Sequence, residues 1–181
     1  MTKLHEVYEL GQSIWYDNLR RLLIQNGDMQ ALIDAGVVGV TSNPSIFEKA
    51  IGGSDDYDEQ IQALVADNKS VQEIYDALVL QDIAETADLF RPVYDKTDGL
   101  DGYVSLEVSP TLAYDTEGTI ADARRYFAAL DRPNIMIKIP GTAQGVPAIR
   151  QAISEGINVN VTLLFSLSSY QAVANAYIDG L

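Results

Sequence analysis

Residues 134–140 read Asn-Ile-Met-Ile-Lys-Ile-Pro, with three isoleucines at alternate positions and Lys138 between the last two. Successive side chains of a β-strand point to opposite faces, so the isoleucines share one face while Met136 and Lys138 occupy the other. A charged lysine is costly to bury in apolar surroundings, and burial favours the neutral amine. That amine is the nucleophile that forms Schiff bases with ketones and aldehydes. The segment therefore predicts a strand that presents Lys138 as a covalent catalyst.

Four further segments repeat this two-faced pattern. Each is rich in aliphatic or aromatic residues and is bounded by Gly, Pro, Asn or Asp, as strands are. The five predicted strands are Ser13–Asp17, Val37–Thr41, Tyr103–Val108, Ile135–Pro140 and Asn158–Leu164. Their polar faces, mostly toward the C-terminal ends, include Asp17, Thr41, Asn43, Ser105, Glu107, Asn160 and Thr162. Glu107 also leaves open a purely structural alternative for Lys138, a buried ion pair.

Helical patterns lie between the predicted strands. They cover Asn18–Asn26, Gln30–Asp34, Ser45–Ile51, Ser54–Ala66, Ser70–Tyr94, Thr116–Leu130, Val146–Glu155 and Ser168–Ile178. Strands that alternate with helices predict an α/β protein with a parallel sheet. A doubly wound sheet, covered on both faces, prefers continuously apolar strands. The polar faces favour a (β/α)8 TIM barrel, whose active site opens at the C-terminal ends of the strands. The alternative is an antiparallel sheet with one face in solvent.

Composition narrows the classes of function. The 181 residues carry a formal net charge of −14, which disfavours nucleic acid and membrane surfaces as partners. The chain has no cysteine, and its one histidine, His5, is predicted to be a solvated helix residue. Thiol nucleophiles and His-based triads are therefore disfavoured. No signal peptide or apolar run of ~18 residues is present, so we expect a cytoplasmic location.

The combination of motifs resembles the transaldolase family. The matching stretches are GVTSNPSIF at 39–47, SLEVSP at 105–110, YDTE at 114–117, IMIKIPGT at 135–142 and GINVNVTLLFS at 156–166. Their order and spacing also fit, and the resemblance covers nearly the whole chain. The stretch IWYDNL at 14–19 is similar to the longer branch of the family, some of whose members are fused to a glucose-6-phosphate isomerase domain.

The resemblance implies a cofactor-free transferase of the pentose phosphate pathway. Such enzymes move a dihydroxyacetone unit from sedoheptulose 7-phosphate or fructose 6-phosphate to an aldose phosphate. Carried over by motif, Lys138 is the Schiff-base lysine, and Asp17 takes the proton of the C4 hydroxyl as the C3–C4 bond breaks. Glu107 and Thr162 hold a water that shuttles protons. Substrate contacts are implied for Asn43, Asn160 and Thr41.

Residues 1–181 correspond to one partial barrel domain of about five β/α units, because eight units need ~250 residues. The resemblance places the phosphate-binding Ser and Arg on the next strand and its loop, which this sequence does not contain. We therefore expect an N-terminal fragment with sugar phosphates as partners, little activity alone, and association of copies through unpaired strand edges. Two alternatives stay open: an inactive half-barrel acting as an assembly module, and another Schiff-base aldolase, such as a fructose-6-phosphate or deoxyribose-phosphate type.

Overall fold

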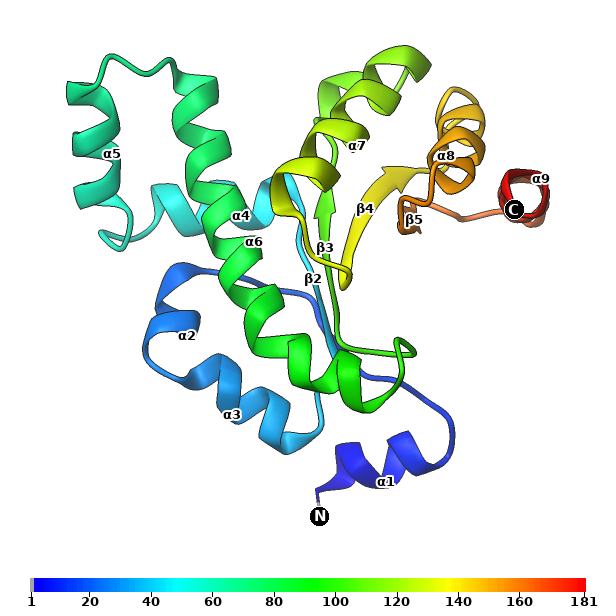
Figure 1. Ribbon diagram of the computed structural model, residues 1–181, viewed down its shortest axis with the longest axis horizontal. Coiled ribbons are helices and arrows are strands. Elements are labelled where there is room, and N and C mark those ends of the chain that lie inside the picture. The colour runs from blue at the N-terminus through cyan, green and yellow to red at the C-terminus, as the bar shows by residue number, and fades with distance from the viewer. Residues whose placement is uncertain (1) are drawn as a thin grey trace. The chain divides into compact units, whose positions relative to one another are not determined.

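The computed structural model describes residues 2–181, along which strands and helices alternate (Figure 1). The strands are β1 (Trp15–Tyr16), β2 (Gly39–Thr41), β3 (Tyr103–Glu107), β4 (Ile135–Pro140) and β5 (Val159–Thr162). The helices are α1 (Lys3–Glu9), α2 (Arg21–Gln25), α3 (Asp28–Ala35), α4 (Pro44–Gly52), α5 (Asp58–Ala66), α6 (Val71–Lys96), the 3-10 turn η1 (Pro110–Leu112), α7 (Thr116–Leu130), α8 (Gly145–Ser154) and α9 (Leu167–Gly180). No helix in this range is both long and apolar enough to span a bilayer.

Strand order decides between the two architectures that β/α alternation permits. The five strands form one sheet in chain order, β1-β2-β3-β4-β5, and the β1–β2 and β4–β5 pairs are parallel. A doubly wound sheet reverses its order at a switch point. Right-handed crossovers in an unreversed order place all the helices on one face, as in a barrel. The sheet is therefore the kind from which a (β/α) barrel is built, and the antiparallel alternative is wrong.

Most predicted elements exist, but several bounds differ. The strand Ile135–Pro140 and the helix Thr116–Leu130 have the predicted ends. The predicted helix Asn18–Asn26 begins only at Arg21, because Arg20 has an extended backbone with φ −157° and ψ 156°. Helix α1 was missed as an element, although His5 was correctly expected to be helical. Thr2 and His5 form a capping box at the start of α1. The Thr2 side chain accepts from the backbone N–H of His5, and the His5 side chain accepts from the backbone N–H of Thr2.

Two compact units make up the chain, Met1–Val104 and Ser105–Leu181. In the first unit, β1 and β2 pair with Trp15 opposite Gly39. A Cβ atom on Gly39 would lie 2.4 Å from the Trp15 ring, so only glycine fits beneath the indole. The Trp15 ring also stacks on Tyr103, with ring centroids 6.5 Å apart and planes 20° apart. These contacts hold Trp15 against Gly39 of β2 and Tyr103 of β3.

The helices of the first unit are joined by a buried polar network. Arg21 of α2 donates through Nε to Asp82 Oδ1 of α6 at 2.8 Å, and both side chains are almost fully buried. Tyr57 donates to Asp82 Oδ2 at 2.8 Å and accepts from the Arg21 backbone N–H at 3.0 Å. Burial raises the pKa of Tyr57 and of Asp82, the latter against the opposing effect of its hydrogen bonds from Tyr57 and Arg21. The network fixes the start of α2 against α6.

Apolar packing closes the region around this network. Tyr57, Ala50 and Leu78 form a buried cluster that joins the beginning of α5 to α4 and α6. Partly buried Ile51, Ile61, Leu64 and Ile74 cover it. The phenol of Tyr57 therefore lies among aliphatic side chains while its hydroxyl reaches the ion pair, the arrangement that buried tyrosines usually adopt.

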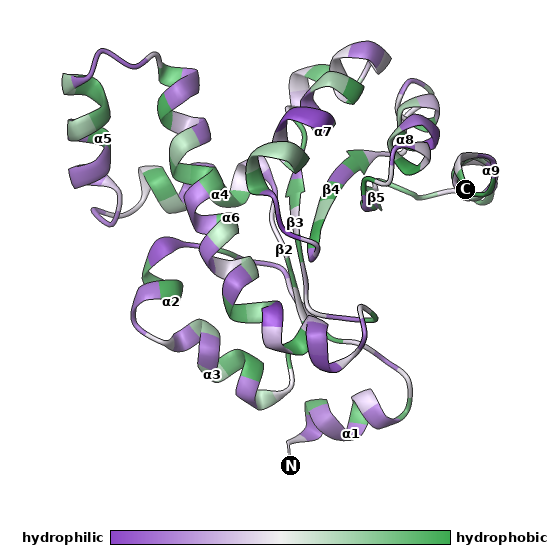
Figure 2. Cartoon of the chain, in the orientation of Figure 1, coloured by the Kyte–Doolittle hydropathy of each residue, from purple (hydrophilic) through white to green (hydrophobic). Residues whose placement is uncertain are grey.

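The second unit confirms the two-faced strand. Ile135, Ile137 and Ile139 have no exposed surface, whereas Met136 and Lys138 on the other parity keep part of their surface exposed. Figure 2 shows hydrophobic residues along β4. Helices α7 and α8 supply buried partners such as Ala123, Tyr126 and Ile149. The isoleucine face packs in the core, and the lysine stands on the face away from it.

Tyr57→Phe tests the polar network. The variant leaves one Asp82 oxygen and the Arg21 N–H without their hydrogen bonds in a buried site, so we expect a loss of ~1–3 kcal/mol in the free energy of unfolding. Chemical denaturation followed by circular dichroism measures it. Tyr114→Phe, at an exposed tyrosine, is the matched control and should change stability by less than ~0.5 kcal/mol. Equal stabilities of the two variants would contradict the assigned role.

Candidate active site

Lys138 and Glu107 lie side by side on neighbouring strands of the second unit. The Lys138 Nζ is 3.3 Å from Glu107 Oε2, and the two side chains are only 12% and 16% exposed. The end of β3 is tied to β4 by the backbone N–H of Val108, which donates to the carbonyl of Lys138 at 3.1 Å. The ion pair left open by the sequence is therefore formed. It is compatible with covalent chemistry, because a carboxylate at this distance can take the proton that an ammonium must lose.

The other side of Lys138 is formed by β5. Asn160 is the register partner of Lys138, and Thr162 is the partner of Pro140. The Asn160 Nδ2 donates to Ser105 Oγ at 3.4 Å, so this amide is oriented by a hydroxyl from β3. Ser105 is fully buried. The sequence predicted that Ser105 lies on the polar face but gave it no role. Its hydrogen bond to Asn160 joins residues 55 positions apart, which no local sequence pattern reveals.

A second group of polar side chains lies in the first unit. Thr41, at the end of β2, donates to Asp17 Oδ1 at 2.6 Å. The hydroxyl thus holds one carboxylate oxygen of Asp17, an arrangement that the sequence did not predict for Thr41. Asp17 itself is exposed just beyond β1. A carboxylate that is fixed at one oxygen and open at the other is suited to accept or return a proton.

Asn43 begins helix α4. Its Oδ1 accepts from the Ile46 N–H at 2.9 Å, and Pro44 occupies the first turn, which is the usual start of a helix. The amide NH2 of Asn43 is not needed for this cap. The structure therefore brings Asp17, Thr41 and Asn43 to the C-terminal ends of β1 and β2, and places Glu107, Lys138, Asn160 and Thr162 on β3, β4 and β5.

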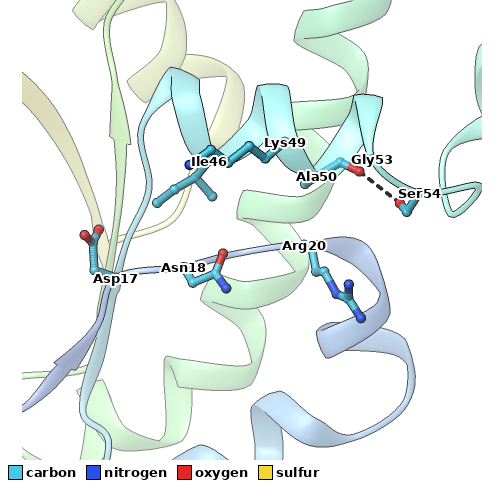
Figure 3. A pocket seen from close by; sticks show the side chains of 8 residues that line it. All are labelled: Asp17, Asn18, Arg20, Ile46, Lys49, Ala50, Gly53 and Ser54. Carbon is cyan, nitrogen blue, oxygen red and sulfur yellow. Dashed lines mark hydrogen bonds between the residues drawn. The ribbon is translucent and has the colours of Figure 1, made fainter.

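A cavity of about 410 Å³ adjoins Asp17. Figure 3 shows the residues that line it: Asp17, Asn18, Arg20, Ile46, Lys49, Ala50, Gly53 and Ser54. They come from the loop between β1 and α2, from α4 and from the turn after α4. Among residues 2–181, no group of three or more histidine or carboxylate side chains is placed to hold a metal ion.

Comparison with known proteins agrees with this geometry. The family model described as transaldolase/fructose-6-phosphate aldolase matches residues 14–180. The chain belongs to the transaldolase/fructose-6-phosphate aldolase family. A transaldolase of Trichodesmium erythraeum (strain IMS101) is 57% identical over 179 residues, and one of Thiobacillus denitrificans (strain ATCC 25259 / T1) is 49% identical over 177. These alignments cover 98% and 97% of this chain, and 47% and 49% of the relatives.

Membership of the transaldolase/fructose-6-phosphate aldolase family confirms the resemblance drawn from the motifs. The chain spans about half the length of the curated relatives that it matches. The matched region contains all seven predicted site residues. Their individual roles stay predictions, and the structure adds Ser105 as the residue that orients Asn160.

The contribution of the Lys138–Glu107 pair to the free energy of unfolding can be measured independently of catalysis. Glu107→Leu leaves a nearly buried ammonium without this partner, so we expect a loss of ~1–3 kcal/mol in unfolding free energy, below the ~3–5 kcal/mol typical of fully buried pairs. The double variant Lys138→Met/Glu107→Leu should recover most of that loss. A double variant that is less stable than either single one would show that the two side chains contribute to stability independently and not as a pair.

Proposed function

We propose that this chain carries the covalent chemistry of a transaldolase, the transfer of a dihydroxyacetone unit between sugar phosphates through a Schiff base on Lys138. The observation that carries the proposal is the pairing of Lys138 with Glu107 on the polar face of the sheet. Lys138 is fixed there by three buried isoleucines on the opposite face. Both relatives described above are named transaldolases, which supports this activity over others.

Imine formation needs a neutral amine and a proton for the departing oxygen. Glu107 takes a proton from the ammonium of Lys138, and the freed lone pair attacks C2 of the ketose. A second nitrogen proton moves to the former carbonyl oxygen, giving a carbinolamine. Glu107 then returns its proton to that hydroxyl, which leaves as water and produces the protonated imine. We assign Thr162 to hold, with Glu107, the water that carries these protons.

Cleavage of the C3–C4 bond follows. Asp17 removes the proton of the C4 hydroxyl, C4 becomes an aldehyde, and the bonding electrons flow into the imine as a neutral enamine. The acceptor aldose phosphate reverses these steps with its own carbonyl carbon. Thr41 holds the Asp17 carboxylate through its 2.6 Å hydrogen bond and so positions the base. Asn43, with its free amide NH2, and Asn160, oriented by Ser105, are assigned to the substrate hydroxyls.

The substrates follow from this chemistry and from the family resemblance. We propose fructose 6-phosphate or sedoheptulose 7-phosphate as donor, an aldose phosphate as acceptor, and a place in the pentose phosphate pathway. We also propose a cytoplasmic location, self-association of copies, and a partial (β/α) barrel as the domain that residues 1–181 form.

A fructose-6-phosphate aldolase is the second candidate, because the description of the matching family model names both activities. The two differ in the fate of the enamine. An aldolase protonates it and releases free dihydroxyacetone, whereas a transaldolase keeps it for an acceptor aldehyde. Incubation with fructose 6-phosphate, with and without erythrose 4-phosphate, separates them, since dihydroxyacetone accumulates without an acceptor only for the aldolase.

The Schiff base is directly testable. Incubation with fructose 6-phosphate and borohydride should add one reduced dihydroxyacetone unit, mapped to the peptide containing Lys138 by mass spectrometry. Lys138→Arg should abolish the adduct, because a guanidinium stays protonated and forms no imine. Lys96→Arg, at an exposed lysine on α6, is the control and should label normally. An adduct on another lysine would refute the assignment.

Asp17→Ala separates cleavage from imine formation. If Asp17 acts only on the C4 hydroxyl, the variant should still be trapped by borohydride on Lys138, as the intact ketose. The rate of C3–C4 cleavage should fall by a factor on the order of 10²–10⁴, as for loss of a general base. Rapid-quench analysis of the trapped sugar reports both quantities. Loss of trapping with normal cleavage of preformed imine would reverse the roles of Asp17 and Glu107.

A further inference from the structure

The cavity beside Asp17 is lined by two cations, Arg20 and Lys49. Neither Arg20 nor Lys49 has an ion-pair partner among residues 2–181. Most of the 12 basic residues of this chain, which has 26 acidic ones, do form an ion pair. With Asp17, the charged lining of the cavity sums to +1, against −14 for the whole chain.

Arg20 also occupies a position that the fold does not favour for arginine. It is the N-cap residue of α2, yet its side chain makes no capping hydrogen bond. Ser, Thr, Asp and Asn are preferred at N-caps, and a cation there opposes the helix dipole. The next backbone N–H, that of Arg21, is bound by the Tyr57 hydroxyl. Local structure therefore does not explain a guanidinium at this position, whereas the binding of an anionic ligand would explain it.

Polar groups of the cavity complement an anion that bears hydroxyls. In Figure 3, Lys49 extends toward Ile46, at the end of the cavity nearer Asp17, and Arg20 leaves the loop at the other end. Ser54 donates to the carbonyl of Ala50 at 2.9 Å, which leaves its hydroxyl oxygen able to accept. Asn18 lines the wall between Asp17 and Arg20. A cavity of about 410 Å³ is within the size range of small-molecule sites.

We propose that this cavity binds the phosphorylated part of a sugar phosphate, with Arg20 and Lys49 supplying the positive charge and Asn18 and Ser54 the polar contacts. The identity of the ligand rests on the proposed function, whereas the existence of the anion site does not. The site is separate from the Ser and Arg of a later strand that the family resemblance assigns to phosphate. The cavity adjoins Asp17, the residue proposed above to act on the C4 hydroxyl of the sugar.

Glycerol 3-phosphate is the probe, because it has a phosphate and hydroxyls but no carbonyl and so cannot react with Lys138. Titration followed by amide NMR should perturb Asn18, Lys49 and Gly53. Arg20→Gln and Lys49→Gln should each weaken binding about tenfold, as expected for a charge-assisted contact. Arg150→Gln and Lys96→Gln remove the same charge at exposed residues outside the cavity and should change affinity less than twofold, because distant charges are screened by salt.

Several outcomes would overturn the proposal. Equal losses in the cavity and control variants would mean that only net charge matters. If inorganic phosphate bound as tightly as glycerol 3-phosphate, the hydroxyl groups would not be recognised. If glycerol bound as tightly as glycerol 3-phosphate, the phosphate group would not be recognised. Arg20→Ser adds an independent readout, since it should leave stability unchanged or slightly raised while binding falls. A loss of stability would assign Arg20 to the fold. Borohydride trapping at Lys138 is scored separately, so failure of the Schiff-base chemistry is distinguishable from failure of the cavity.

Discussion

The exclusion of three isoleucines from water is the constraint on which the site depends. Ile135, Ile137 and Ile139 are fully buried, and because strand side chains alternate, their burial fixes the direction of Lys138. A slip of one residue would move the lysine into the helix-facing core and expose the isoleucines. The predicted nucleophile is therefore held by apolar packing on the face opposite to it, and the contacts of Lys138 with Glu107 and Asn160 follow from the pairing of β4 with β3 and β5.

Two kinds of polar arrangement coexist in this chain. The network of Arg21, Tyr57 and Asp82 is almost fully buried, and its members bond one another, as a structural network must. The predicted catalytic groups keep one face accessible: Asp17 is exposed, and the pair of Lys138 and Glu107 retains some solvent contact. The first arrangement holds the loop that follows β1, and the second is open to a ligand. Burial, more than hydrogen bonding alone, distinguishes the two.

Side-chain periodicity and turn residues were enough to predict the five strands, the alternate burial along β4, and the bounds of β4 and α7. The Lys138–Glu107 contact was also foreseen, as an alternative. Contacts between distant segments were not: Arg21 meets Asp82 across 61 residues, and Asn160 meets Ser105 across 55. The hydrogen bond from Thr41 to Asp17, like the meeting of Arg20 and Lys49 at one cavity, depends on how loops fold back after the strands. No local pattern encodes that path.

The two ends of the Asn43 amide are suited to two different purposes, helix capping and ligand binding. Its oxygen begins α4, while its nitrogen remains available to a ligand. Aspartate caps helices as well as asparagine does, but it has no donor to offer at this position. Under the substrate contact proposed for Asn43, a change from amide to acid would therefore leave folding unchanged and lower only the rate of the reaction. The proposed contact thus predicts that a screen for stable protein would accept variants of Asn43 that a screen for turnover would reject.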